Sequence, residues 1–287
     1  MTRKQEILHR AERILLLPAC TQKALQLLDS PEADSEDLAR LIEFDPGLTA
    51  NLLKIVNASR FDAPVCSVRD AVGAFGSGMI IQFFVSTGVV PFYVQKIEGY
   101  DLAPHMLMQS SVTAALCAEE LGRALGMGVP GHTYTSALLA GVGKLILGAY
   151  VKVEARPILD LAAREGIGFD EAEDRILGIN HAEVGAWLLE RWRVPGPIVR
   201  VVRHHLRPEL CPQVDPVLDL VHAGMVMSKM IGLGLGADGL NYIPSRVVID
   251  RLGLTPEVAD RVSAEVVERL GPLNDLFLEC ADTNCLL

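Results

Sequence analysis

The segment HAEVGAWLLERWRVPGPIVRVVRHHLRPE, residues 181–209, contains two helix-like stretches separated by a turn that prolines bound. Apolar residues recur in it every three or four positions, which is the pattern of a helix with one buried face. Pro195 and Pro197 restrict the backbone between the two stretches, and proline is well tolerated in the first turn of a helix. We therefore expect helices over residues 181–191 and 197–205.

Helical spacing dominates the rest of the chain, and no run alternates strictly between apolar and polar residues as a strand would. We predict an all-α fold, a multi-helix orthogonal bundle. Gly185 lets helices approach closely, and Trp192 supplies a large apolar surface. The other expected helices cover residues 4–16, 21–30, 34–43, 45–57, 68–75, 79–90, 103–122, 133–150, 153–165, 169–177, 217–231, 244–252 and 256–270.

Composition narrows the class of protein. With 287 residues, half of them hydrophobic, the chain is expected to form one continuous unit with a large interior. Its formal net charge is −10, and a field of that sign repels the phosphate backbone of nucleic acids. We therefore expect no general binding of nucleic acid.

A membrane location is also not expected. The longest apolar stretch, residues 79–94, is interrupted by polar residues and is shorter than the roughly 20 residues that cross a bilayer. The N-terminal sequence MTRKQEILHR lacks the apolar core of a secretory signal. We predict a cytoplasmic protein.

One glycine-rich stretch, residues 232–239, contains GLGADG, which matches the dinucleotide-binding pattern GxGxxG. That pattern binds a pyrophosphate only between a strand and a helix, and here it follows a helix. We interpret it as a flexible loop that ends the helix, and as the best internal break in the chain. Residues 232–287 would then form a helical C-terminal extension.

The histidines are the only plausible catalytic set. His181, His204 and His205 are concentrated in the second half of the chain, and imidazole with carboxylate is a common ligand set for divalent metals. Adjacent helical residues diverge by about 100°, so His204 and His205 would serve two ions, or one would be a surface residue. We favour a role as satisfied polar groups between helices. A weak metal site and a residual ligand pocket remain the alternatives.

Four segments, in order, resemble the HDOD domain, an output module related to HD-type phosphohydrolases. They are DPGLTANLLKIVNAS (residues 45–59), SVRDAVGAFG (67–76), LLAGVGKLIL (138–147) and the segment 181–209 quoted above. The resemblance covers residues 14–231 and implies an N-terminal helical lobe over about 14–95 and an HD-like helical core over about 100–231.

Some residues that match the family's motifs have an expected structural role. Asp45 is expected to cap a helix that has Pro46 at its first position, and Asn57 to bond backbone groups at that helix's end. The full set is Asp45, Pro46, Leu48, Asn57, Gly76, Lys144, Gly185, Trp192 and Pro195.

The resemblance also implies that the catalytic apparatus is mostly missing. The His-Asp pair of the HD hydrolases falls on Ala140 and Gly141. An upstream metal histidine falls at or near Ser110, and a late metal aspartate falls on Gly224. None of these four side chains can bind a divalent ion as imidazole or carboxylate does.

The resemblance therefore implies a non-catalytic regulatory module of bacterial signal transduction that acts on a protein partner, with no metal and no cofactor. A homodimer stays open. The first alternative is a metal-dependent phosphohydrolase or cyclic-dinucleotide phosphodiesterase. The second is a receptor for a small molecule or nucleotide in the vacated metal pocket.

Overall fold

The computed structural model describes residues 2–14, 35–43, 65–73 and 95–282, without 193, 240 and 241, together with a few single residues between 49 and 93; side chains are described up to residue 270. In these parts the chain is all-α and contains no strand, as predicted. The helices are α1 Arg3–Ile14, α3 Ser35–Glu43, η1 Glu98–Tyr100, α6 Met106–Ala124, α7 Thr133–Leu139, α8 Lys144–Glu165, α9 Phe169–Leu177, α10 His181–Arg191, α11 Gly196–His204, η2 Pro208–Leu210, α12 Pro216–Ile231, α13 Arg246–Leu252 and α14 Pro256–Asp282.

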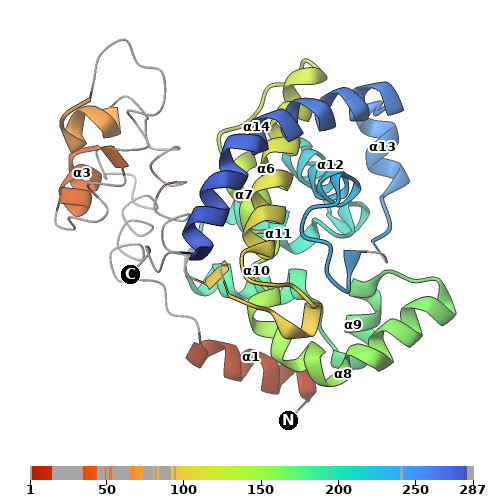
Figure 1. Ribbon diagram of the computed structural model, residues 1–287. Helices are drawn as coiled ribbons and strands as arrows, with labels where there is room; N and C mark the ends of the chain where they lie inside the picture. Colours follow the sequence, from red (N-terminus) through yellow and green to blue (C-terminus); the bar gives the residue numbers. More distant parts are fainter. Residues whose placement is uncertain are drawn as a thin grey trace.

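The long helices α6 and α12 pack along each other at the centre, and α14 lies along the outer side of α6 (Figure 1). Small residues allow this approach, because a Cβ atom added at Gly224 of α12 would lie 2.5 Å from the Ala114 carbonyl oxygen of α6. The helices α8 and α9 form one neighbouring pair, and α10 and α11 form another. Arg3 of α1 reaches Glu154 of α8 at 2.7 Å.

Two hydrophobic clusters are buried. The larger cluster joins α1 and the helices from α6 to α14. The smaller cluster belongs to the N-terminal part of the chain. Its buried members are Leu38, Ala39, Ile42, Leu52, Val68, Ala71, Val72, Ile80 and Phe83.

One predicted pair of helices is divided at the wrong place. The expected break between residues 150 and 153 is absent, because α8 runs without interruption from Lys144 to Glu165 and accommodates Pro157. The break falls instead at residues 140–143, where turns replace regular helix. Gly143 explains the position: a Cβ atom there would lie 1.9 Å from the His181 carbonyl oxygen, so the two backbones meet at this point.

The glycine-rich stretch 232–239 ends α12, as expected, with Gly232 in the left-handed conformation. It is packed against other elements, however, and is not a free loop. A Cβ atom at Gly236 would lie 2.2 Å from the Tyr100 carbonyl oxygen, which also accepts a 2.7 Å hydrogen bond from the Ala237 amide. The helices α13 and α14 then contribute Val248 and other residues to the larger cluster, so the segment after residue 232 shares the core of the preceding helices.

Several sequence predictions lie outside the described residues. These are the cap at Asp45 and Pro46, the motif positions Leu48, Asn57 and Gly76, and most of the apolar stretch 79–94.

One stretch, Thr133–Glu165, is long and apolar enough to cross a membrane, but 72% of its most apolar window is buried inside the protein. Such burial is typical of a core helix.

Candidate functional site

A buried ion-pair cluster lies where α8 begins, α12 ends and the glycine-rich stretch passes. Asp238 places one carboxylate oxygen 2.8 Å from Lys144 Nζ and 3.1 Å from Lys229 Nζ. All three side chains are largely buried. Burial alone would raise the pKa of Asp238, but the two ammonium groups outweigh it and hold that pKa well below its usual range. Burial also lowers the pKa of Lys229, against the attraction of Asp238.

Two tyrosine rings contact the ammonium groups of this cluster. Lys144 Nζ lies 5.2 Å from the centroid of the Tyr100 ring, and Lys229 Nζ lies 5.1 Å from the centroid of the Tyr242 ring. An aromatic face attracts a cation at such distances, and more strongly away from water. The rings therefore offset part of the cost of burying two positive charges.

The carboxylate of Glu173, fully buried in α9, is the second acidic group of the centre. It accepts hydrogen bonds from the Tyr100 hydroxyl and from the His181 backbone amide. The His181 ring places Nδ1 2.9 Å from the same carboxylate. The repulsion of Glu173 adds to burial in raising the pKa of Tyr100 well above its usual range. Each oxygen of Glu173 thus has a partner from the protein.

His205 and His222 continue the polar centre toward α13. His205 Nδ1 lies 2.7 Å from the Val202 carbonyl oxygen, and its ring centroid lies 5.9 Å from that of His181. His222 accepts a hydrogen bond at Nε2 from the Ser245 amide, so its Nδ1 carries the proton and donates to the His205 carbonyl oxygen at 2.7 Å. Burial lowers the pKa of both rings.

Two buried atoms in this centre lack a partner within the described part of the chain. They are His205 Nε2 and Asp238 Oδ1. Since His205 Nδ1 donates to a carbonyl, Nε2 presents a lone pair, and Oδ1 is an acceptor as well. Two acceptors match a ligand or a solvent molecule that donates hydrogen bonds, or a cation.

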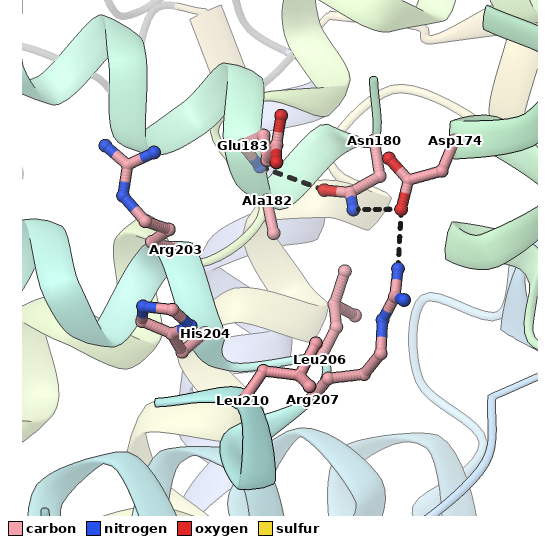
Figure 2. A pocket seen from close by; sticks show the side chains of 9 residues that line it. All are labelled: Asp174, Asn180, Ala182, Glu183, Arg203, His204, Leu206, Arg207 and Leu210. Atoms are coloured by element: carbon pink, nitrogen blue, oxygen red, sulfur yellow. Dashed lines mark hydrogen bonds and ion pairs between the residues drawn. The ribbon is translucent and has the colours of Figure 1, made fainter. Parts of the chain in front are cut away.

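His204 faces away from its neighbour, toward a hollow of about 180 Å³ on the surface between α10 and α11 (Figure 2). Figure 2 shows a chain of hydrogen bonds from Glu183 through Asn180 and Asp174 to Arg207 along one side of this hollow. The His204 side chain lies apart from that chain and makes no hydrogen bond with a described residue. Burial, and then the nearby arginines of α11, lower the pKa of His204. The structure therefore places His181 and His205 in the buried centre and His204 outside it.

The family model of the HDOD domain matches residues 14–208, which is more than half of the chain. The chain belongs to the HDOD domain family.

Solved structures share the fold of this HDOD domain. An HDOD domain protein of unknown function from Geobacter sulfurreducens is similar over 99% of both chains, with a TM-score of 0.63 and 23% identity. A Shewanella amazonensis protein, provisionally named a phosphohydrolase, has a TM-score of 0.61 and 21% identity over 91% of this chain and 93% of its own. A Marinobacter aquaeolei protein, provisionally named a signal transduction protein, has a TM-score of 0.62 and 22% identity over 92% and 63%.

A curated protein of Treponema pallidum, itself uncharacterized, is 24% identical to the HDOD chain over 218 residues. The match covers 74% of this chain and 42% of that relative, so the chain spans less than half of the relative's length.

The positions at which the family resemblance expects metal ligands are packed against helices. The Ser110 hydroxyl donates to the Leu107 carbonyl oxygen, and a Cβ atom at Gly141 would lie 2.9 Å from the Leu107 side chain. Ala140 is fully buried, and Gly224 faces α6 as described above. None of these four residues offers an imidazole or a carboxylate to the buried centre.

The donor set does not fit a divalent metal. Both lysine ammonium groups lie on Asp238, and the Glu173 carboxylate is already hydrogen-bonded, so the acceptors left are His181 Nε2, His205 Nε2 and Asp238 Oδ1. The two ammonium groups repel a cation that approaches Asp238, which leaves two imidazoles, and a stable site needs more ligands than two. Within the described residues no group of three or more His, Cys, Asp or Glu side chains is arranged to hold a metal ion.

Several residues of the centre are absent from the sequence prediction. Glu173 falls on the buried face of α9 together with Phe169, Ala172 and Leu177, and a carboxylate within such an apolar stripe is a signal that could have been used. Asp238 gives no such signal, because it lies in a glycine-rich stretch with no periodicity. Lys144 was identified only through the family resemblance.

The remaining motif residues lie at a close helix contact and at helix ends. A Cβ atom at Gly185 would already lie 3.1 Å from the Val142 side chain, so this glycine allows α10 to approach the turn at 140–143 closely. Trp192 is buried at the end of α10, and Pro195 is the N-cap residue of α11.

Proposed function

We propose that this HDOD domain is a non-catalytic regulatory module of bacterial signal transduction that works by binding a protein partner. The observation that carries the proposal is the ion-pair cluster of Lys144, Asp238 and Lys229. Its two positive charges lie on a carboxylate of the buried centre, whereas a metal-dependent hydrolase needs carboxylates that are free to surround its cations.

The physical argument concerns charge. Metal-dependent hydrolysis requires carboxylates and imidazoles that are free to bind the ion, and an open position for an activated water. Here two lysines neutralise Asp238, and hydrogen bonds from Tyr100 and His181 occupy the oxygens of Glu173. A divalent cation would have to enter beside two ammonium groups, which repel it. The centre is therefore suited to holding helices together, and the surface is left for recognition.

The experiment is a hydrolysis assay on cyclic dinucleotides and nucleoside phosphates, with and without added manganese, beside a metal analysis of the purified protein. We expect turnover at the background level and no stoichiometric iron, manganese or zinc. An active HD-type hydrolase serves as the positive control. Turnover that His205→Ala abolishes would overturn the proposal, and so would one tightly held metal ion per chain.

A second candidate function has a specific observation in its favour. His205 Nε2 and Asp238 Oδ1 are two buried acceptors without a partner in the described chain, and together they suit a small ligand that donates hydrogen bonds. A screen of nucleotides and small cations by thermal unfolding tests it, because a ligand of the native state raises the midpoint. A raised midpoint that His205→Phe removes would favour the receptor over the partner-binding module.

We propose that the domain acts in the cytoplasm, with partner binding as the output of a signal.

A further inference from the structure

The short helix α13 lies at the edge of the bundle (Figure 1). One side of it buries Val248 and Leu252 in the larger hydrophobic cluster. The opposite side presents Arg246, Val247 and Asp250 to solvent. Residues at positions i, i+1 and i+4 of a helix lie within about 100° of one another, so these three share one exposed face. We call it the α13 face.

Exposed apolar side chains extend the α13 face toward η2. Val247 is 47% exposed, Ile243 57% and Leu210 61%. The Ser245 hydroxyl donates a 2.9 Å hydrogen bond to the Glu209 carboxylate, which holds the segment before α13 against η2. Each of the three apolar residues lies within two positions of one end of this bond. Single exposed apolar residues are ordinary, whereas a group of them in one place is typical of an interaction site.

The two charges of the α13 face are available to a partner. Arg246 and Asp250 are exposed, and neither makes an ion pair within the described part of the chain, whereas the adjacent Arg251 pairs with Asp219 of α12. The spacing of four residues would allow an ion pair within the helix, but the basic residue comes first, which is the less favourable order. The α13 face therefore carries one free positive and one free negative charge.

Both charges lie at the end of α13 that suits them least. A helix has a partial positive charge at its N-terminus and a partial negative charge at its C-terminus. Arg246 is the first residue of α13, and Asp250 lies in its last turn. A second helix that runs in the opposite direction would reverse this situation, because its C-terminus would lie beside Arg246 and its N-terminus beside Asp250.

We propose that the α13 face binds a second copy of this chain, with α13 of the two subunits antiparallel about a twofold axis. Arg246 then lies opposite Asp250 of the partner subunit, and the same pair is formed a second time by symmetry. Val247 and the apolar side chains beside it lie against their copies between the two ion pairs. This inference concerns assembly and is independent of the proposed function.

The composition of the face favours a second copy over a different protein. An interface about a twofold axis uses the same surface on both subunits, so that surface must complement itself. The α13 face does so, because it has one charge of each sign and an apolar residue with them. The net charge of −10 on each chain opposes association, but salt screens charges that lie more than about 8 Å apart.

The size of the face sets the expected strength. Seven residues make a helix about 10 Å long, so the contact is smaller than the roughly 800 Å² per partner of a standard interface. We therefore expect a reversible dimer with a dissociation constant in the micromolar range.

The test is sedimentation velocity of the full chain at concentrations from about 1 to about 300 µM. Arg246→Asp and Asp250→Arg should each raise the dissociation constant at least about tenfold, because like charges then face each other twice. An equal mixture of the two variants should form dimers again. In that mixture one chain presents two carboxylates to the two guanidinium groups of the other.

The matched controls are Arg156→Asp and Asp160→Arg. They change the same residue types at the same spacing on the exposed side of α8, where the two residues pair with each other. Each should leave the dissociation constant within about twofold. Circular dichroism establishes that all four variants are folded, and recovery of the dimer in the mixture is a second proof for the α13 variants.

Four outcomes would overturn the inference. They are a wild-type chain that stays monomeric over the whole range, a dimer that persists in both α13 variants, a mixture of these variants that stays monomeric, and an equal loss of dimer in the controls. A monomeric wild-type chain would leave the α13 face to a different protein. The hydrolysis and metal measurements do not depend on the dimer, so this inference and the proposed function can fail separately.

Discussion

His204 and His205 are neighbours in the sequence and belong to two different regions of the molecule. His205 is fully buried in the charged centre, with Nδ1 bonded to a backbone carbonyl oxygen. His204 lines the surface hollow of Figure 2 between α10 and α11, which we call the α10–α11 groove. Successive residues of a helix point about 100° apart, so one turn of α11 supplies both regions.

The comparison shows how burial decides what a polar group can do. In the centre, charge is neutralised within the protein, because an unpaired charge away from water is costly. In the groove, pairs such as Arg203 with Glu190 are partly exposed and can be exchanged. The same residue types therefore hold the fold together in one region and are available to a partner in the other.

The largest expected effect of a single substitution is in the centre. Asp238→Ala leaves Lys144 and Lys229 buried without their carboxylate, and breaking one side of a buried pair typically costs about 3 to 5 kcal/mol of unfolding free energy. Urea unfolding measures it. The exposed counterpart Asp160→Ala, which removes the partner of Arg156 on α8, should cost about 1 kcal/mol or less. Similar losses in the two variants would remove the distinction between buried and exposed pairs.

A smaller effect is expected where α12 meets α6. Gly224→Ala would bring a methyl group within 2.5 Å of the Ala114 carbonyl oxygen, and overpacking of this kind typically costs about 1 to 3 kcal/mol. Gly196→Ala is the matched control, because nothing lies within 4 Å of its added methyl group. If both glycines tolerate alanine equally, the close approach of α6 and α12 is not as tight as described.

The stability of the centre should depend on pH. Burial lowers the pKa of His205 and His222 below the ordinary value of about 6.5. Below about pH 6.5 the unfolded chain therefore binds more protons than the folded one, so the free energy of unfolding is greatest above that pH and falls as the pH decreases. Each histidine contributes a slope of at most about 1.4 kcal/mol per pH unit.

Urea unfolding between about pH 7.5 and about pH 5.5 measures this slope. His205→Gln should flatten it, because the side chain that resists protonation is gone. A stability that does not change over this range would contradict the buried, neutral state of the two rings.

The smallest effect is expected in the groove. His204→Ala should change the free energy of unfolding by no more than about 0.5 kcal/mol, since the side chain is only partly buried and has no partner in the described chain. Thermal unfolding measures this change in stability. A loss as large as that of a core substitution would place His204 in the structural centre.

The sequence predicted those helices whose ends are locally determined. The expected α9 and α10, residues 169–177 and 181–191, agree with the structure because Gly178 ends one helix in the left-handed conformation and Asn180 caps the next. The break at residues 140–143 was missed because it depends on a contact with His181, almost forty residues away in the chain. Such a contact leaves no periodic signal.

The candidate site was predicted in part for the same reason. The divergence of His204 and His205 follows from helical geometry alone, and the structure agrees with it. The partner of Lys144 could not be predicted, because Asp238 lies 94 residues further along the chain. Nothing in the glycine-rich stretch marks this aspartate as buried, since only the tertiary packing against Tyr100 brings it inside.

The central claim is that the charges of the buried centre are used by the protein itself. A double-mutant cycle with Lys144→Met and Asp238→Asn, read by urea unfolding, tests it most directly. The account predicts a coupling energy of about 2 kcal/mol or more, because Asp238→Asn leaves Lys144 buried without its carboxylate, and that cost is absent once Lys144 has also been replaced. A coupling energy below about 0.5 kcal/mol would contradict it.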